Sequence, residues 1–183
     1  NSHAKAAKAD FSEEIIPITT KDGIVSKDGT IRAGSTPEDL AKLDPAFDVY
    51  GTVTAGTSSP LTDGASAVLV TSEDYAKKHK LPILARIKGA IVVGLEPSIM
   101  GMGPLVASEK LLKKLGLTIK DMDIIEINEA FAAQSIPCCA ELKVDPAKVN
   151  IEGGAIALGH PLGASGARIT GKAALLLHRT KGK

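Results

Sequence analysis

The strongest chemical signal in the sequence is a glycine-rich stretch that ends in a histidine and a proline. It contains Gly153-Gly154 and, further along, Gly159-His160-Pro161. Glycine at this density indicates a backbone that turns sharply or approaches a ligand closely. Pro161 fixes its own φ and removes a backbone donor, which helps to hold the preceding ring. These surroundings favour His160 as a catalytic acid, base or hydrogen-bond donor over a structural histidine.

The same stretch has the glycine spacing of a phosphate-binding loop without the other residues of that loop. Gly154 and Gly159 stand at the P-loop interval. A P-loop then needs a lysine for the phosphates and a Ser or Thr hydroxyl for Mg²⁺, whereas His160 and Pro161 follow here. Binding of a nucleoside triphosphate is therefore not expected.

Asn128 is the second candidate, because it comes directly after a predicted strand at 124–127 and stands at the mouth of a helix predicted over 129–142. Asparagine is a preferred helix N-cap, and Glu129 suits the positive end of the helix dipole. The alternative is an amide that faces a ligand, because open α/β sheets bind ligands at the carboxyl ends of their strands. The residue types alone leave both interpretations open.

The remaining histidines and the two cysteines are weaker candidates. His79 lies in a run of lysines, and His178 ends a predicted helix, where a cation suits the dipole. Cys138 and Cys139 are adjacent within a predicted helix, which favours small core residues over nucleophiles or a disulfide. No set of His, Cys and Asp has metal-ligand spacing, so no metal site is expected.

The elements that must position these turns alternate between strand and helix from residue 64 onward. Apolar runs between turn signals predict strands, and apolar residues at helical spacing predict helices. Strands are expected at 65–70, 83–93, 124–127 and 149–151, and helices at 73–80, 105–115, 129–142 and 164–178. The alternation predicts an α/β fold with a mostly parallel sheet covered by helices. Residues 1–62 are irregular and predict a lid with little core of its own.

Composition places the chain among globular proteins and excludes several classes of function. Of its 183 residues, 44% are apolar, which is enough apolar surface to offset the entropy of ordering. A net charge of +1 and only 3% aromatic residues argue against nucleic acid or an anionic membrane as a partner. No apolar run reaches the roughly 18 residues of a membrane span. Two cysteines and no N-terminal apolar segment predict a reducing compartment.

At both turns, and at two places upstream, the sequence resembles the thiolase family. Residues 128–132 resemble the family's Asn-Glu-Ala-Phe motif, and residues 153–161 resemble its Gly-His-Pro motif, at the expected separation. Residues 43–47 and 52–59 resemble its coenzyme A-binding stretches. The resemblance covers essentially the whole chain. It is greatest to the degradative 3-ketoacyl-CoA thiolases, which include the β-subunit of the bacterial fatty-acid oxidation complex.

The resemblance implies a thiolase-like α/β fold with a mixed sheet covered by helices, of which this chain holds a part. Residues 1–62 would be part of the loop or lid domain, 63–81 the last strand and helix of the N-terminal domain, and 82–183 a C-terminal domain without its last strands. Thiolases use two catalytic cysteines, one in a Cys-Ser/Ala-Ser-Gly-like turn and one in a Cys-x-Gly motif. Neither motif occurs in these residues. We therefore expect a fragment that is inactive on its own.

The resemblance also assigns roles to individual residues. In the family, a cysteine thiolate attacks the 3-keto group, the carbon–carbon bond breaks, acetyl-CoA leaves, and a second CoA takes the acyl group from sulfur. His160 would activate the nucleophile and polarise the thioester oxygen, and Asn128 would hold a water that completes this oxyanion site. The residues implied to contact CoA are Ser59 and Phe47, and those implied to line the acyl-pantetheine tunnel are Ala130 and Phe131. CoA is a substrate in this scheme, and no cofactor is expected.

Three other functions stay open at this level. One is a biosynthetic acetoacetyl-CoA thiolase, and another is a non-catalytic remnant that binds acyl-CoA or a protein. The third, a related condensing enzyme, would need a second histidine in place of Asn128. Expected partners are CoA and acyl-CoA, a second copy of the chain or the remainder of a thiolase, and a partner subunit of a β-oxidation multienzyme complex. The expected location is the bacterial cytoplasm or an organelle matrix.

Overall fold

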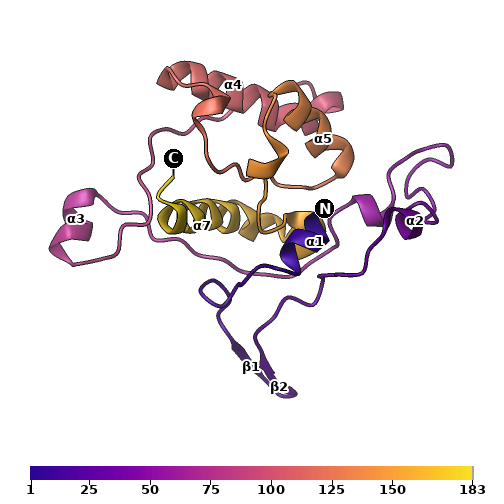
Figure 1. The fold of residues 1–183 in the computed structure, drawn as a ribbon, viewed down its shortest axis with the longest axis horizontal. Helices are drawn as coiled ribbons and strands as arrows, with labels where there is room; N and C mark the ends of the chain where they lie inside the picture. Colours follow the sequence, from indigo (N-terminus) through magenta and orange to yellow (C-terminus); the bar gives the residue numbers. More distant parts are fainter. Residues whose placement is uncertain (183) are drawn as a thin grey trace.

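The computed structural model describes residues 1–182, and its longest helix, α7 (Leu162–Thr180), lies at the centre of the molecule (Figure 1). Helices α4 (Gly103–Leu115) and α5 (Ala132–Glu141) pack against each other on one side of α7 (Figure 1). The short helix α1 (Ser2–Ala6) packs against α6 (Ala155–Leu158), which directly precedes α7. The glycine-rich turn predicted around His160 therefore lies between α6 and α7.

The remaining helices are short and lie on the extended segments that surround this centre. Two of them, α2 and α3, lie at opposite ends of the view in Figure 1. The short α-helices are α2 (Pro37–Leu40) and α3 (Glu73–Lys78), and the 3₁₀ helices are η1 (Ala55–Thr57), η2 (Pro97–Met102), η3 (Ile119–Asp121) and η4 (Pro146–Lys148). No helix among residues 1–182 is long and apolar enough to cross a membrane.

Local capping chemistry sets several of these helix ends where the sequence predicts them. The Ser72 side chain accepts a hydrogen bond from the backbone N–H of Tyr75 and begins α3. Gly116 ends α4 in the left-handed region, with φ of 66°, where the lack of a Cβ removes the steric penalty. These signals act within one turn of helix, so they operate wherever the segment lies.

The sheet differs from the prediction. Among residues 1–182, the only paired strands are β1 (Ile18–Thr20) and β2 (Gly23–Val25), which form an antiparallel hairpin. The segments 65–70 and 83–93 are extended but pair with no described strand. Their side chains are largely solvent-exposed, with Leu69 77% and Val92 95% accessible. Strand pairing needs a second backbone beside the first, and residues 1–182 supply none for these segments.

One parallel bridge does join two of the predicted strands. Ile125 and Val149 pair in parallel, through hydrogen bonds from Ile125 N to Lys148 O and from Asn150 N to Ile125 O, each 2.9 Å long. The segments 124–127 and 149–151 therefore lie side by side as a mostly parallel sheet requires. This contact brings the turn after residue 127 close to the turn after residue 151.

A buried ionic cluster ties the N-terminal segment to α7. The side chain of Lys172 is only 1% exposed, and its ammonium contacts the carboxylates of Glu14 and Glu152, the latter at 2.7 Å. The same ammonium lies 4.5 Å from the centre of the Phe11 ring. Arg179, two turns further along α7, pairs with Glu152 and with Glu13. Residues 11–14 are thus held on the helix that follows the His160 turn.

Candidate active site

The structure brings Asn128 and His160 together across a separation of 32 residues. Asn128 Nδ2 lies 3.2 Å from His160 Nε2, and on the other side of the ring Nδ1 lies 2.6 Å from Ser165 Oγ. Both Asn128 and His160 are half-buried. The imidazole is therefore held at both nitrogens, by one residue after the 124–127 segment and by one in the first turn of α7.

The N-cap interpretation of Asn128 is wrong. Helix α5 begins at Ala132, three residues after the predicted start at residue 129, and its N-cap residue is Phe131. The amide of Asn128 instead faces His160, with its Oδ1 buried and without a hydrogen-bond partner among the described residues. A buried carbonyl oxygen in this state is an open acceptor, able to bind a water or a substrate group.

Glu129 links the two turns, a role that the sequence patterns did not indicate. Its carboxylate accepts hydrogen bonds from Ser2 Oγ at 2.8 Å, from Asn150 Nδ2 at 2.9 Å and from the backbone N–H of Ile156 at 3.2 Å. These donors come from α1, from the turn after Val149 and from the start of α6. Charge-assisted hydrogen bonds of this kind are stronger than neutral ones, so one carboxylate holds three segments together.

Asn150 completes the link through the backbone. Its Oδ1 accepts from Ile127 N and its Nδ2 donates to Ile127 O, both at 2.9 Å, so the side chain pairs with residue 127 as a strand would. Asn150 is 3% exposed and adopts a φ of 43°, a left-handed conformation that asparagine tolerates. Because asparagine tolerates the left-handed region, its position before the glycine-rich stretch could have indicated a turn at residue 150.

Close packing explains part of the glycine density. A Cβ at Gly154 would overlap the Glu129 carboxyl group and the Asn150 amide. Gly159 has a φ of 90°, and a Cβ there would overlap the side chain of Thr62. The first glycine therefore makes room for the link between the two turns, and the second permits the backbone bend that aims His160.

Ser59, one of the predicted CoA-contacting residues, is hydrogen-bonded to the segment that follows Asn128. Ser59 donates to the carbonyl of Ala130 from its backbone N–H at 3.0 Å and from its hydroxyl at 3.2 Å. Ser58 and Phe131 form an isolated antiparallel bridge. The stretch that resembles a CoA-binding segment is thus joined to the turn that carries Asn128.

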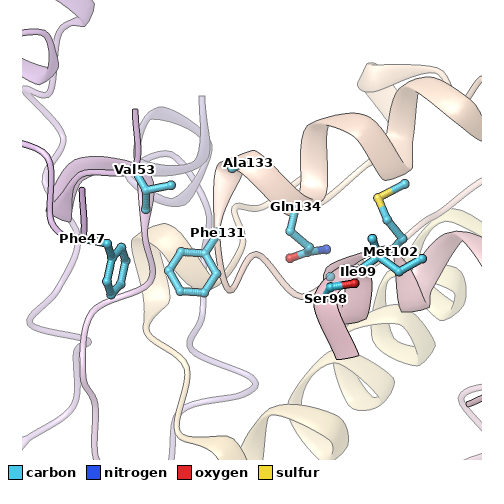
Figure 2. Close-up of a pocket in the computed structure, with 9 residues that line it drawn as sticks. Phe47, Val53, Ser98, Ile99, Met102, Phe131, Ala133 and Gln134 are labelled. Carbon is cyan, nitrogen blue, oxygen red and sulfur yellow. The ribbon is translucent and has the colours of Figure 1, made fainter. Parts of the chain in front are cut away.

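A groove of about 390 Å³ opens beside this junction. Figure 2 shows the rings of Phe47 and Phe131 next to each other on one side, with Gln134 and the side chains of η2 on the other. The two ring centres are 6.2 Å apart in an edge-to-face arrangement. Further lining residues are Val53, Ser98, Ile99, Gly101, Met102 and Ala133. The groove is wide enough and apolar enough to accept an extended aliphatic or pantetheine-like chain.

The two cysteines of the chain are poorly suited to nucleophilic attack. Cys138 is fully buried and its thiol lies 3.4 Å from the carbonyl oxygen of Gly101. Burial, followed by the neighbouring Cys138 and by Glu129, raises the pKa of the Cys139 thiol. A raised pKa leaves less of the reactive thiolate. Within residues 1–182, no group of three or more His, Cys, Asp or Glu is placed to hold a metal ion.

Glu126 is a buried carboxyl group one residue before the buried Ile127, and we expect it to make stability pH-dependent. Desolvation by burial raises its pKa from 4.5 to about 7, against the opposing charges of Arg168 and Lys172. Both of its oxygens are buried without a hydrogen-bond partner among the described residues. Between these two pKa values the folded state holds a proton that the unfolded state has lost, so stability falls as pH rises from about 4.5 through about 7.

Glu126→Gln should remove this fall in stability, which amounts to about 3 kcal/mol over the full range. Urea unfolding at pH 5 and pH 8 measures it: the variant should gain stability over the wild type at pH 8 and not at pH 5. Glu141→Gln, at an exposed position of α5, is the matched control and should change neither value. An equal effect of Glu126→Gln at both pH values would contradict the prediction.

Comparison with known proteins identifies the family of the chain. Residues 1–74 match the family model for the N-terminal domain of thiolase, and residues 81–183 match that for its C-terminal domain. A 3-ketoacyl-CoA thiolase of Vibrio parahaemolyticus is 53% identical over 178 residues, which is 92% of this chain and 46% of that protein. The chain therefore belongs to the thiolase family.

Solved structures show the same fold. Human mitochondrial 3-ketoacyl-CoA thiolase in complex with CoA superposes with a TM-score of 0.95 at 48% identity, over 100% of this chain and 47% of that one. An acetyl-CoA acetyltransferase of Bacillus anthracis gives a TM-score of 0.93 at 44% identity, over 100% of this chain and 48% of that one. The extended segments thus have the course that they follow in complete α/β thiolase folds. The chain spans about half the length of the relatives it matches.

Proposed function

We propose that this polypeptide supplies the Asn128–His160 half of an active site that cleaves 3-ketoacyl-CoA with CoA, giving acetyl-CoA and a shortened acyl-CoA. The observation that carries the proposal is the 3.2 Å contact between Asn128 Nδ2 and His160 Nε2, beside a groove that suits a pantetheine-like chain. A relative of known structure that binds CoA supports the choice of ligand.

The chemistry of the pair suits this reaction. His160 Nε2 takes the proton of a cysteine thiol that another segment of polypeptide supplies, and the thiolate attacks the 3-keto carbon. When the bond between C2 and C3 breaks, its electron pair moves to the enolate of acetyl-CoA, whose thioester oxygen becomes negative, and the acyl group stays on the cysteine sulfur. A water held by Asn128 Oδ1 and the protonated His160 donate hydrogen bonds to that thioester oxygen. Preorganised donors of this kind contribute ~3–4 kcal/mol each. An acid from the remaining polypeptide protonates the enolate at C2, and the thiol of a second CoA then takes the acyl group and releases the cysteine.

The partners follow from the same proposal. Residues 65–70 and 83–93 carry exposed apolar side chains on unpaired backbone. Such edges and faces suit pairing with the remaining strands of a thiolase, in the same or another polypeptide. CoA acts as a substrate in this scheme. Four further points stay predictions: the domain boundaries at residues 62 and 81, binding of a second copy of the chain, binding of a β-oxidation partner subunit, and a location in the bacterial cytoplasm or an organelle matrix.

A hybrid enzyme tests the proposal. The aligned 178 residues of the Vibrio parahaemolyticus enzyme are replaced by those of this chain. The hybrid should cleave 3-ketoacyl-CoA, because the fold is shared, and should leave a saturated acyl-CoA of equal length intact. This chain by itself should cleave neither. A folded hybrid that binds CoA but has no thiolysis activity would favour the non-catalytic remnant, and faster cleavage of acetoacetyl-CoA than of longer substrates would favour the acetoacetyl-CoA branch.

A further inference from the structure

His160 lies within a chain of hydrogen bonds that accounts for every polar atom of its ring. With the Asn128 amide oriented as in this structure, its Nδ2 donates and His160 Nε2 accepts. The Ser165 hydroxyl lies 3.1 Å from the carbonyl of Pro161 and donates to it, so Ser165 Oγ accepts from His160 Nδ1 at 2.6 Å. This arrangement requires the proton of the neutral imidazole to be on Nδ1.

We propose that Ser165 is a positioning residue that holds His160 in the Nδ1-protonated tautomer. The less common tautomer of a neutral histidine is the one with its proton on Nδ1, so an environment must select it. Ser165 is suited to this because it is 4% exposed and is fixed in the first turn of α7 by its own N–H bond to Pro161 O. Water therefore does not compete for Nδ1.

The consequence for the reaction rests on the proposed thiolase function. An Nδ1-protonated ring keeps a lone pair on Nε2, which accepts from Asn128 Nδ2 in this structure and can accept a thiol proton when the thiol replaces that amide as its partner. The opposite tautomer would present an N–H there and could not accept a proton from a thiol. Ser165 does not line the groove, and the hydrogen bonds of its hydroxyl join it to His160 and Pro161, so it would act through His160.

The alternative arrangement is well defined, and this makes the proposal testable. If the Asn128 amide is rotated by half a turn, Oδ1 accepts from an Nε2 proton. The Ser165 hydroxyl then turns away from Pro161 and donates to Nδ1. Exchange of the amide O and N leaves the heavy atoms of the side chain at almost the same positions, so heavy-atom positions do not distinguish the two arrangements. The tautomer itself therefore has to be measured.

The ¹⁵N resonances of the imidazole in this chain report the tautomer directly, because protonated and unprotonated ring nitrogens are well separated. They are recorded at alkaline pH and assigned by their loss in His160→Gln. In the wild type the proton should be on Nδ1. Ser165→Ala should lower the ratio of the Nδ1 to the Nε2 tautomer by about tenfold, equivalent to ~1.4 kcal/mol. Ser165→Thr, which keeps the hydroxyl, should retain the wild-type ratio.

Ser135→Ala is the matched control. Ser135 is also buried, lies in the first turn of α5 and donates to the carbonyl four residues earlier, but the described hydrogen bonds of its hydroxyl are to Phe131 and Gln134. This variant should leave the tautomer ratio unchanged. A wild-type ring protonated mainly on Nε2 would overturn the proposal, even if Ser165→Ala did not fold. So would a ratio that Ser165→Ala and Ser135→Ala change equally.

In the hybrid enzyme, Ser165→Ala should lower kcat about tenfold with KM unchanged, and Ser165→Thr should restore it. The two proposals fail in different ways. A hybrid without thiolysis activity would leave the tautomer of this chain as measured, whereas the wrong tautomer in an active hybrid would overturn the role of Ser165 alone.

Discussion

Replacement of His160 by alanine should lower kcat of the hybrid thiolase by ~10²–10⁴, the usual range for loss of acid–base help. Among residues 1–182, the hydrogen-bond partner described for Asn128 Nδ2 is the His160 ring, and under the proposed function its loss removes both the base for the thiol and a donor to the enolate oxygen. Substrate should still bind, because the groove at Phe47 and Phe131 does not include His160. The measurement is kcat and KM for a 3-ketoacyl-CoA at saturating CoA.

His178→Ala is the control for this prediction. His178 is exposed in the last turn of α7 and so tests the general effect of removing an imidazole from the same helix. It should leave kcat within about twofold, since a helix-end charge contributes only ~0.3–1 kcal/mol to stability and none to the site. Equal kcat values for His160→Ala and the unmodified hybrid would exclude His160 from the chemistry.

Lys172→Met should destabilise the chain by about 3–5 kcal/mol, the usual cost of removing one partner of a buried ion pair. The methionine has a similar volume but leaves the carboxylates of Glu14 and Glu152 without their shared cation. Each of those carboxylates is itself about one-fifth exposed, so water offsets part of the loss. Urea unfolding followed by circular dichroism measures the change, and limited proteolysis should show cleavage near residues 11–14.

Lys42→Met provides the same substitution at an exposed ion pair. The side chains of Lys42 and Asp39 are 74% and 60% exposed, so this variant should cost less than about 1 kcal/mol. The triple variant Lys172→Met, Glu14→Gln and Glu152→Gln removes all three charges and should recover part of the stability. The explanation would be wrong if Lys172→Met cost no more than Lys42→Met.

Two helix ends could be predicted from the sequence, and so could the two turns that the structure brings together at Asn128 and His160. Ser72 and Gly116 act within a single turn, so their effect does not depend on the rest of the fold. His160 could be recognised as a candidate because glycines and a proline surround it. Asn128 could be recognised because it is the first polar residue after the predicted strand at 124–127. The resemblance to thiolases then indicated the family, which the comparisons confirm.

The strands could not be predicted in the same way. An apolar run such as 83–93 has the sequence of a strand, but a strand exists only where another backbone pairs with it. Among residues 1–182 no backbone pairs with this run, and no local pattern indicates which segment would. The parallel bridge between Ile125 and Val149 formed because both segments are present.

The sequence by itself determined the residue types at the two candidate turns and the ends of several helices, because side-chain type and helix signals are local properties. Only the tertiary structure decided which of those residues contact one another. Asn128 is an excellent N-cap by type, yet the bridge between 124–127 and 149–151 turns its amide toward His160. Glu129 and Ser165 have ordinary sequence contexts and acquire their roles from partners 27 and 5 residues away. Hydrogen bonds depend on distance and direction in space, and the chain sets these only when its distant turns pack together.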